Sequence, residues 1–381
     1  MARLTKQLMV ACVGSTNNPN DFGGLPYHLV EAGRENGVIK GGFSFGASRL
    51  NLRIGRYLWN ARHYAKARKY GGFQYSETFL RSLWRQVPDV EKRAPIINLF
   101  QLYPKAEMER ATPKFFYLDQ TLSQVFHYYG SGSSMSAGWR NDVLNRERQQ
   151  YAAAEKVFFR SHWAASRAKI DYGLPDTKVA VVLPGANINK EVLDTFDREH
   201  QVQEPARNEL RLVFVGKEWR RKGLDRLLRA MKIADSQGAR LSLSVIGMRP
   251  EEEVLKIAEG LQVNWLGFVD KARDPMGFVH LLSQHDIGVL LSRQEAGGVS
   301  LREFGRLGMP VIGPNTGGSP EFAMAESAKL VSPCASDLEI SEILLDLSAD
   351  PNALYLAKRE AWERRLDFDW TAAVDKLAKL V

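Results

Sequence analysis

Strand-like and helix-like hydrophobic patterns alternate through the second half of the chain. Short strand-like segments rich in apolar residues predict strands at 211–216, 241–247, 263–267, 287–291 and 310–313. Helical spacing of apolar residues predicts the intervening helices at 222–236, 251–259, 276–283 and 299–307. This alternation is typical of a doubly wound parallel sheet, which binds its ligands outside the carboxyl ends of its strands.

The first half of the chain opens with the same pattern. Residues 8–13 predict a strand, a polar loop follows, and Pro26 suits the first turn of a helix that runs to about Glu35. Further buried strands are expected at 115–118, 157–159 and 179–183, whereas 41–112 has an irregular pattern. The sequence therefore predicts an α/β protein with two Rossmann-like, doubly wound domains.

A polar segment at 189–208 lacks an apolar period and predicts a linker between the two domains. The expected division is a domain at 1–190, a linker at 191–208, a domain at 209–365 and a C-terminal helix within 366–381. Packing of that last helix back on the N-terminal domain is one arrangement that we consider.

Charge is spread unevenly along the chain. Residues 1–190 hold 27 Lys and Arg against 14 Asp and Glu, a net +13, whereas 191–381 hold 25 against 30, a net −5. A basic first domain attracts anions such as phospholipid headgroups, lipid-linked phosphates or nucleic acid, although a solvated basic surface has the same composition. An anionic membrane surface is therefore one candidate partner.

The segment 49–69 carries much of this positive charge at helical spacing. One face of the predicted helix is apolar, and arginines and lysines flank it; the apolar positions are Leu50, Ile54, Tyr57, Leu58, Ala61 and Ala65. Such a helix either lies on an anionic membrane or packs on its domain core with a basic outer face.

Composition places the protein in the cytoplasm, with peripheral binding to the inner face of the membrane as an alternative. The chain has no apolar run near the roughly 18 residues of a membrane-spanning helix, and its start predicts a core strand rather than a signal peptide. Its two cysteines, Cys12 and Cys334, argue against a disulfide framework.

Two glutamates eight positions apart mark the stretch EAGGVSLRE, which follows a predicted buried strand and enters the next helix. The glycine pair allows close backbone approach to a ligand, and amides at a helix start suit a phosphate. A carboxylate can accept hydrogen bonds from both hydroxyls of a ribose diol. Two unrelated surface acids near a helix start would give the same spacing.

A basic turn, GKEWRRKG, joins another predicted strand to its helix. Four cations in six residues at the mouth of a parallel sheet can neutralise a leaving diphosphate. A solvated basic turn remains the alternative when this segment is considered alone.

These two stretches, with WLGFVDK and PVIGPNTGGSPE in order after the basic turn, resemble the retaining glycosyltransferases of family 4, which have the GT-B fold and an E-x7-E motif. The resemblance covers most of 180–335 and includes the loop at Gly23 and Gly24. It implies two Rossmann-like domains that face a central cleft.

The resemblance also implies roles for individual residues. Catalysis would involve Glu295, which holds hydroxyls of the donor sugar, Lys222, which binds the diphosphate, and Asp119. Glu303 would hold the ribose of the nucleotide. The remaining donor-binding positions would be Lys217 or Arg221 beside Lys222, the backbone of Gly297, Gly298, Val299 and Ser300, the base contacts near Phe268 and Val269, and Gly23 and Gly24 under the donor phosphate or the acceptor.

Two departures from the family pattern leave alternatives open. Lys217 stands where many members have an arginine, so Lys222 is the better-supported cation. Many members have a histidine at the end of a middle strand of the first domain, where this chain has Asp119. Asp119, His127 or His162 is then expected near the reacting carbon, and Asp119 can equally serve as a helix cap. Asp119 and His127 are also the candidates for acceptor binding.

The implied reaction is retaining transfer of a hexose-type sugar from a UDP- or GDP-sugar to a hydroxyl of a saccharide or a lipid-linked acceptor. The alternatives are a GT-B enzyme that modifies a nucleotide sugar, such as an epimerase, and a non-catalytic basic protein that binds membrane or nucleic acid. We expect no cofactor, no obligatory metal and no nucleic-acid partner. A D-x-D sequence at 367–369 offers only two acids, which is a poor ligand set.

Overall fold

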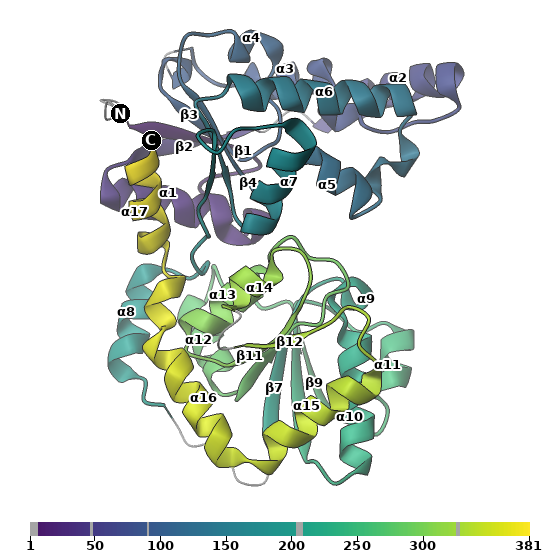
Figure 1. Ribbon diagram of the computed structural model, residues 1–381, viewed down its shortest axis with the longest axis vertical. Coiled ribbons are helices and arrows are strands. Elements are labelled where there is room, and N and C mark those ends of the chain that lie inside the picture. Colours follow the sequence, from purple (N-terminus) through teal and green to yellow (C-terminus); the bar gives the residue numbers. More distant parts are fainter. Residues whose placement is uncertain (1–6, 46–48, 90, 203–208, 325–327) are drawn as a thin grey trace. The chain divides into compact units, whose positions relative to one another are not determined.

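The computed structural model describes residues 7–45, 49–89, 91–202, 209–324 and 328–381, with side chains described from 52 onward in the second of these ranges (Figure 1). The chain folds into two compact units. The N-terminal unit is Met1–Leu183 with Ala373–Val381, and the C-terminal unit is Pro184–Ala372.

A six-stranded parallel sheet forms the centre of the N-terminal unit, in the order β2-β1-β3-β4-β5-β6. Its strands are β1 (Leu8–Val13), β2 (Ile39–Phe45), β3 (Ile96–Asn98), β4 (Lys114–Leu118), β5 (Lys156–Phe159) and β6 (Val179–Val181). Its main helices are α1 (Leu25–Asn36), α2 (Arg49–Ala67), α3 (Glu77–Trp84), α5 (Leu122–His127), α6 (Ala137–Ala153) and α7 (His162–Tyr172). Every residue of β4 is buried, as expected for a strand covered on both faces.

A second six-stranded parallel sheet forms the C-terminal unit, in the order β12-β11-β10-β7-β8-β9. Its strands are β7 (Leu210–Val215), β8 (Leu241–Ile246), β9 (Gln262–Gly267), β10 (Ile287–Val289), β11 (Val311–Pro314) and β12 (Ala328–Val331). Its helices include α8 (Lys190–Glu199), α9 (Trp219–Lys222), α10 (Leu224–Ser236), α11 (Glu252–Ala258), α12 (Pro275–Ser283), α13 (Val299–Arg306), α14 (Ser319–Ala323), α15 (Asp337–Ala349) and α16 (Pro351–Glu363). The strand order reverses between β7 and β10, which is the switch point where doubly wound sheets bind ligands.

The boundary between the units lies between Leu183 and Pro184 rather than at residue 190, and the segment predicted as a linker, 191–208, contains α8. This helix has only two buried apolar side chains, Leu193 and Phe196, which is too short a pattern to stand out in a charged sequence. Residues 203–208 of the predicted linker lie outside the described residues. At the other end, Ala373–Val381, which includes most of α17 (Trp370–Leu380), groups with the N-terminal unit.

Two strands of the N-terminal sheet, β2 and β3, fall within the stretch whose pattern was irregular. β2 contains two adjacent glycines and β3 has only three residues, so neither produces a clear alternating or continuous apolar run. Among the described residues, no helix combines the length and the hydrophobicity needed to cross a bilayer.

Candidate functional site

The site begins where two loops of the C-terminal unit meet at the switch point of its sheet. One loop follows β7 and contains the basic turn 216–223; the other follows β10 and leads to α13. Because β7 and β10 are neighbouring parallel strands, both loops leave the same edge of the sheet.

Backbone hydrogen bonds hold these two loops together. The amide of Leu291 donates to the carbonyl oxygen of Lys222 over 3.2 Å, and the amide of Arg293 donates to that of Arg221 over 2.8 Å. Gly223 makes this approach feasible: its φ is +77°, and a Cβ there would lie 2.1 Å from the carbonyl oxygen of Leu291. The position of the basic turn is therefore fixed by main-chain contacts.

Two arginines, the exposed Arg293 and the buried Arg226, strengthen the same junction. Both terminal nitrogens of Arg293 donate to Asp225 at the start of α10, each over 2.8 Å. Arg226 donates to the carbonyl oxygen of Leu291 over 3.2 Å and to those of Ser332 and Ala335. A two-bonded arginine–carboxylate pair fixes both distance and orientation.

The junction brings together three of the predicted site residues around one carboxylate. Glu295 is 8% exposed, and its Oε2 binds Lys222 Nζ, Arg221 Nη1 at 3.3 Å and Ser292 Oγ at 3.2 Å. A buried carboxylate is costly unless it is paired, and this one has three donors. Arg221 also pairs with Glu218 over 2.8 Å, so its guanidinium lies between two carboxylates.

Next to this carboxylate the backbone turns into α13. Gly298 is the N-cap, with a φ of +105°, a value that favours glycine. At Gly297 an added Cβ would lie 2.4 Å from the ring of Phe322, so this glycine is required by packing. Val299 is half-buried and Ser300 is buried. The helix thus starts beside the cations, with its amino end attractive to an anion.

Glu303 lies in the second turn of α13 and has a different partner from Glu295. It is 3% exposed, and its Oε1 binds Lys271 Nζ, which comes from the loop after β9. Burial raises the pKa of Glu303, and the charge and hydrogen bond of Lys271 offset part of that rise. Lys271 is the last residue of the stretch WLGFVDK, and its contact with Glu303 was not predicted from the sequence.

The same loop carries the two residues predicted to meet the base. Phe268 is 60% exposed and Val269 is half-buried. Lys217 of the basic turn is exposed, and its Nζ lies 5.5 Å from the centre of the Phe268 ring. An exposed phenyl ring with a cation over it offers an apolar platform at the rim of the candidate site.

In the N-terminal unit, the predicted glycine loop follows β1. Three consecutive residues before α1 are left-handed: Phe22 at φ +50°, Gly23 at +67° and Gly24 at +95°. Gly24 is the N-cap of α1, so this loop leads directly into the amino end of a helix, which is attractive to an anion. It lies at the switch point of this sheet, because β1 is flanked by β2 and β3.

The acceptor candidates lie at the ends of β4 and β5. Asp119 follows β4 and is half-buried; the cap of α5 is Thr121, whose hydroxyl accepts from the Gln124 amide, so Asp119 is not that cap. His127 is exposed at the end of α5, and His162 is exposed at the start of α7 after β5. Asp119 and His162 thus follow two neighbouring strands at the same sheet edge.

The loop that carries Asp119 is held by a fully buried carboxylate, Glu147 of α6. This side chain accepts from the amide of Leu122 over 2.9 Å and from the hydroxyls of Tyr151 and Tyr172. Burial raises its pKa to about 7, although these hydrogen bonds favour the charged form. The group is a positioning residue that sequence reasoning missed, since nothing distinguishes it within the polar pattern of α6.

The D-x-D sequence is engaged in ion pairs. Asp369 accepts from Arg306 Nε over 2.5 Å, and Asp367 lies 3.7 Å from Arg364. Within the described ranges, no three histidine, cysteine, aspartate or glutamate side chains gather as metal ligands. That the reaction requires no metal stays a prediction.

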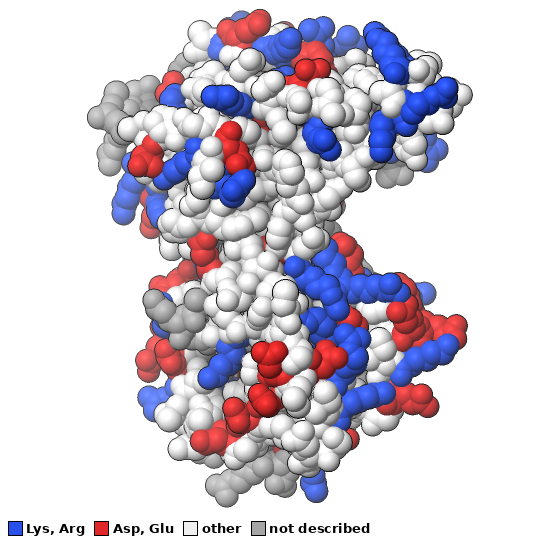
Figure 2. Space-filling view, turned by 45° about the vertical axis from the view of Figure 1, so that its right-hand side comes forward, with Lys and Arg blue, Asp and Glu red and all other residues white. Residues whose placement is uncertain are grey.

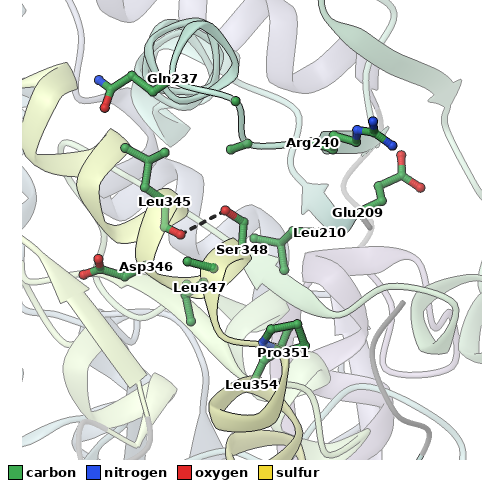
Figure 3. Close-up of a pocket in the computed structure, with 13 residues that line it drawn as sticks. Glu209, Leu210, Gln237, Arg240, Leu345, Asp346, Leu347, Ser348, Pro351 and Leu354 are labelled. Atoms are coloured by element: carbon green, nitrogen blue, oxygen red, sulfur yellow. Dashed lines mark hydrogen bonds between the residues drawn. The ribbon is translucent and has the colours of Figure 1, made fainter. Parts of the chain in front are cut away.

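A cavity of about 610 Å³ in the C-terminal unit lies elsewhere (Figure 3). It is lined by Leu210 and Arg240, which stand at the amino ends of β7 and β8, and by residues of α15 and α16. The candidate site lies at the opposite, carboxyl ends of these strands. None of the predicted site residues lines this cavity.

Comparison with known proteins supports a glycosyltransferase. The family model described as glycosyl transferases group 1 matches residues 195–365, which include the basic turn and both glutamates. A protein from Klebsiella pneumoniae, described as an uncharacterized 41.2 kDa protein in cps region, is 28% identical over 186 residues. That match covers 48% of this chain and 49% of the relative, so it spans about half of the relative's length.

Solved structures establish the fold. Sucrose-phosphate synthase from Thermosynechococcus elongatus matches with a TM-score of 0.69 and 16% identity, covering 98% of each chain. HepE from Anabaena, solved with UDP and glucose, matches with a TM-score of 0.61 and 15% identity, again over 98% of each chain. WaaG, titled a glycosyltransferase involved in lipopolysaccharide biosynthesis, matches at 0.57 and 13% over 98% and 99%. This chain has the GT-B fold, as predicted.

The close approach at Gly223 gives a first testable expectation. Gly223→Ala forces a side chain against the Leu291 carbonyl and into a left-handed conformation, so we expect a loss of about 3 kcal/mol in the free energy of unfolding. Gly238→Ala is the matched control, because its φ is +94° and no atom lies within 4 Å of the new Cβ. Denaturant unfolding should show a loss of only about 1 kcal/mol there. Equal losses would mean that the junction is not tightly packed.

A second expectation concerns the pH dependence of stability through Glu147. Its carboxyl keeps a proton in the folded state up to about pH 7, whereas in the unfolded chain it loses the proton near pH 4.5. The folded state therefore loses stability as pH rises through that window. Glu147→Gln removes the titration, so its stability relative to wild type should rise by about 2 kcal/mol from pH 5 to pH 8. If the free energies of unfolding of the two proteins change in parallel with pH, the raised pKa of Glu147 is wrong.

Proposed function

We propose that the protein is a retaining glycosyltransferase. It binds a UDP- or GDP-sugar on its C-terminal unit and transfers a hexose-type sugar to a hydroxyl of a saccharide or a lipid-linked acceptor. The observation that carries the proposal is the convergence of Glu295, Lys222 and Arg221 beside the start of α13. The group 1 family match and the HepE structure with UDP and glucose support the same assignment.

The donor is held by three kinds of group. Glu303, buried in α13, accepts hydrogen bonds from the ribose diol, and Lys271 beside it offsets part of the rise in pKa that burial causes. Lys222 and Arg221 bind the diphosphate, assisted by the amides of Gly298, Val299 and Ser300 at the helix start. Glu295 orients hydroxyls of the sugar. The backbone near Phe268 and Val269 meets the base, and Lys217 lies at the rim.

Catalysis then depends on protein cations placed where negative charge develops on the leaving diphosphate. The bond between sugar and phosphate breaks early, which gives an oxocarbenium-like transition state and a diphosphate with growing negative charge. Cations held by a rigid backbone stabilise that charge without reorganising. The acceptor hydroxyl attacks the face that the diphosphate leaves, and the diphosphate takes the hydroxyl proton. Asp119 is proposed to lie near the reacting carbon, and His127 to help bind the acceptor.

Nucleotide binding provides the first test. In a thermal-shift panel of nucleoside diphosphates and their sugars, one nucleotide class should raise the unfolding temperature, because a ligand that binds only the folded state stabilises it. Glu303→Gln keeps the side-chain volume but removes the acceptor charge, and Glu303→Ala removes the side chain. Both variants should lose most of the shift, measured from each variant's own unfolding temperature.

The matched control is Glu253→Gln, which removes a carboxylate that is exposed and pairs with Arg220 on the outside of the same unit. It should keep the full nucleotide response. If wild type responds to no nucleotide or nucleotide sugar, the transferase proposal fails.

Turnover provides the second test. Lys222→Ala removes a cation that stabilises the leaving diphosphate. The kcat/KM for release of nucleoside diphosphate from the preferred donor should therefore fall about 10²- to 10³-fold. Arg220→Ala is the control within the same turn, because Arg220 is exposed and pairs with Glu253. Its rate should stay within about twofold of wild type, as for a surface change. If the only sugar product is an epimer of the donor's sugar, the protein is a nucleotide-sugar-modifying enzyme instead.

A further inference from the structure

Helix α2 of the N-terminal unit has two apolar faces on opposite sides. The inner face packs on the unit through Leu52 and Trp59, whose ring lies 5.0 Å from Trp139 and 6.2 Å from Phe73. Trp59 Nε1 donates to the carbonyl oxygen of Gly71 over 3.2 Å, and a Cβ at Gly55 would already touch Phe73 at 3.0 Å. These contacts fix which side of the helix faces the unit.

The outer face of α2 is apolar as well, and nothing in the described residues covers it. Ile54 is 51% exposed, Tyr57 74%, Leu58 61% and Tyr64 48%. At 100° per residue these positions, with Ala61 and Ala65, form one stripe along the side opposite Trp59. Of the twelve exposed large hydrophobic side chains described for the chain, five lie between residues 54 and 70.

Cations flank this stripe on both sides. Arg53 borders one edge of it and Arg62 the other, while Arg56 and Lys66 lie further round the helix, and all four are exposed. No aspartate or glutamate occurs between Glu35 and Glu77. Figure 1 shows α2 extending to the side of its sheet, and in Figure 2 blue side chains gather on that part of the unit.

We propose that the outer face of α2 docks on an anionic phospholipid bilayer. The helix lies in the plane of the membrane, the stripe from Ile54 to Tyr64 enters the boundary between headgroups and acyl chains, and the flanking cations contact lipid phosphates. Apolar side chains between two rows of cations are the arrangement that such a surface selects. The side chains of Arg49 and Leu50 lie outside the described residues and are not needed for this proposal.

Charge decides between a bilayer and other occupants of this face. A second copy of the chain would bring its own row of arginines and lysines against these, with no acid on either helix to compensate. A nucleic acid would use the cations but would leave Ile54 and Leu58 against a charged backbone. An anionic bilayer satisfies both the cations and the apolar stripe. This inference does not depend on the proposed transferase activity.

Vesicle sedimentation tests the proposal with the full chain. Wild type should sediment with phosphatidylcholine vesicles that contain phosphatidylglycerol and not with phosphatidylcholine alone. Arg62→Gln with Lys66→Gln should weaken binding about 25-fold, since each cation near an anionic surface contributes about fivefold. Tyr57→Ser with Leu58→Ser should weaken it about tenfold or more through lost apolar burial. All four side chains are exposed, so the fold should survive, which a thermal unfolding curve checks.

Matched controls separate this face from the general positive charge of the unit. Arg85→Gln with Arg148→Gln removes two exposed cations elsewhere, and Ile170→Ser removes an apolar side chain that is 70% exposed on α7. Both should keep vesicle binding within about twofold of wild type, as surface changes away from the docking face do. The proposal is overturned if these controls weaken binding as much as the α2 variants, or if wild type ignores anionic vesicles. The proposal is also overturned if the protein is a dimer that Leu58→Ser dissociates, because the face then binds a second copy of the chain. It is likewise overturned if the protein binds duplex DNA in place of vesicles and Tyr57→Ser with Leu58→Ser keeps full affinity for the DNA.

Discussion

The candidate site depends on the hydrogen bonds between the main chains of Arg221 and Lys222 and those of Arg293 and Leu291. Strand order reverses between β7 and β10, so the segments that follow these strands turn to opposite faces of the sheet and leave a gap at its edge. The two hydrogen bonds join the loop after β7 to the loop after β10 at this edge. As a result, the main chain that carries the cations lies at a fixed place beside Glu295, which is a form of preorganisation that electrostatic catalysis requires.

The carboxylates of the C-terminal unit fall into two groups by partner. Asp286, Asp225 and Asp197 each bind an arginine through two parallel hydrogen bonds of 2.8 to 3.0 Å. Glu303 instead binds the ammonium group of Lys271, and Glu295 binds that of Lys222 together with one nitrogen of Arg221. An arginine fork fixes geometry, whereas a lysine on a flexible stem can exchange one oxygen partner for another. The first group therefore stabilises the fold, and the second suits carboxylates that must take up ligand hydroxyls.

Sequence reasoning located β7 to β11 of the C-terminal unit, because their apolar residues stand out between polar turns, but it did not predict β12, α15 or α16. It also selected Lys222 and Glu295, which the structure brings into contact. It did not find Lys271, Glu147 or the Asp225–Arg293 pair, because those partners are far apart in sequence and no local pattern joins them. The helix α8 was missed for the opposite reason: its pattern is local but contains only two buried apolar residues.

Helix α2 shows that a periodicity can predict a helix correctly without showing which of its faces packs on the core. The apolar positions that predicted the helix, such as Ile54 and Leu58, face outward, and the packed side is formed by Leu52, Gly55 and Trp59. Periodicity identifies a face but not which of two apolar faces the core takes. Here contacts with other elements decide: the Trp59 ring lies 5.0 Å from that of Trp139 and 6.2 Å from that of Phe73, so the side that carries Trp59 packs on the unit. The opposite stripe, which includes Ile54, Tyr57 and Leu58, stays exposed.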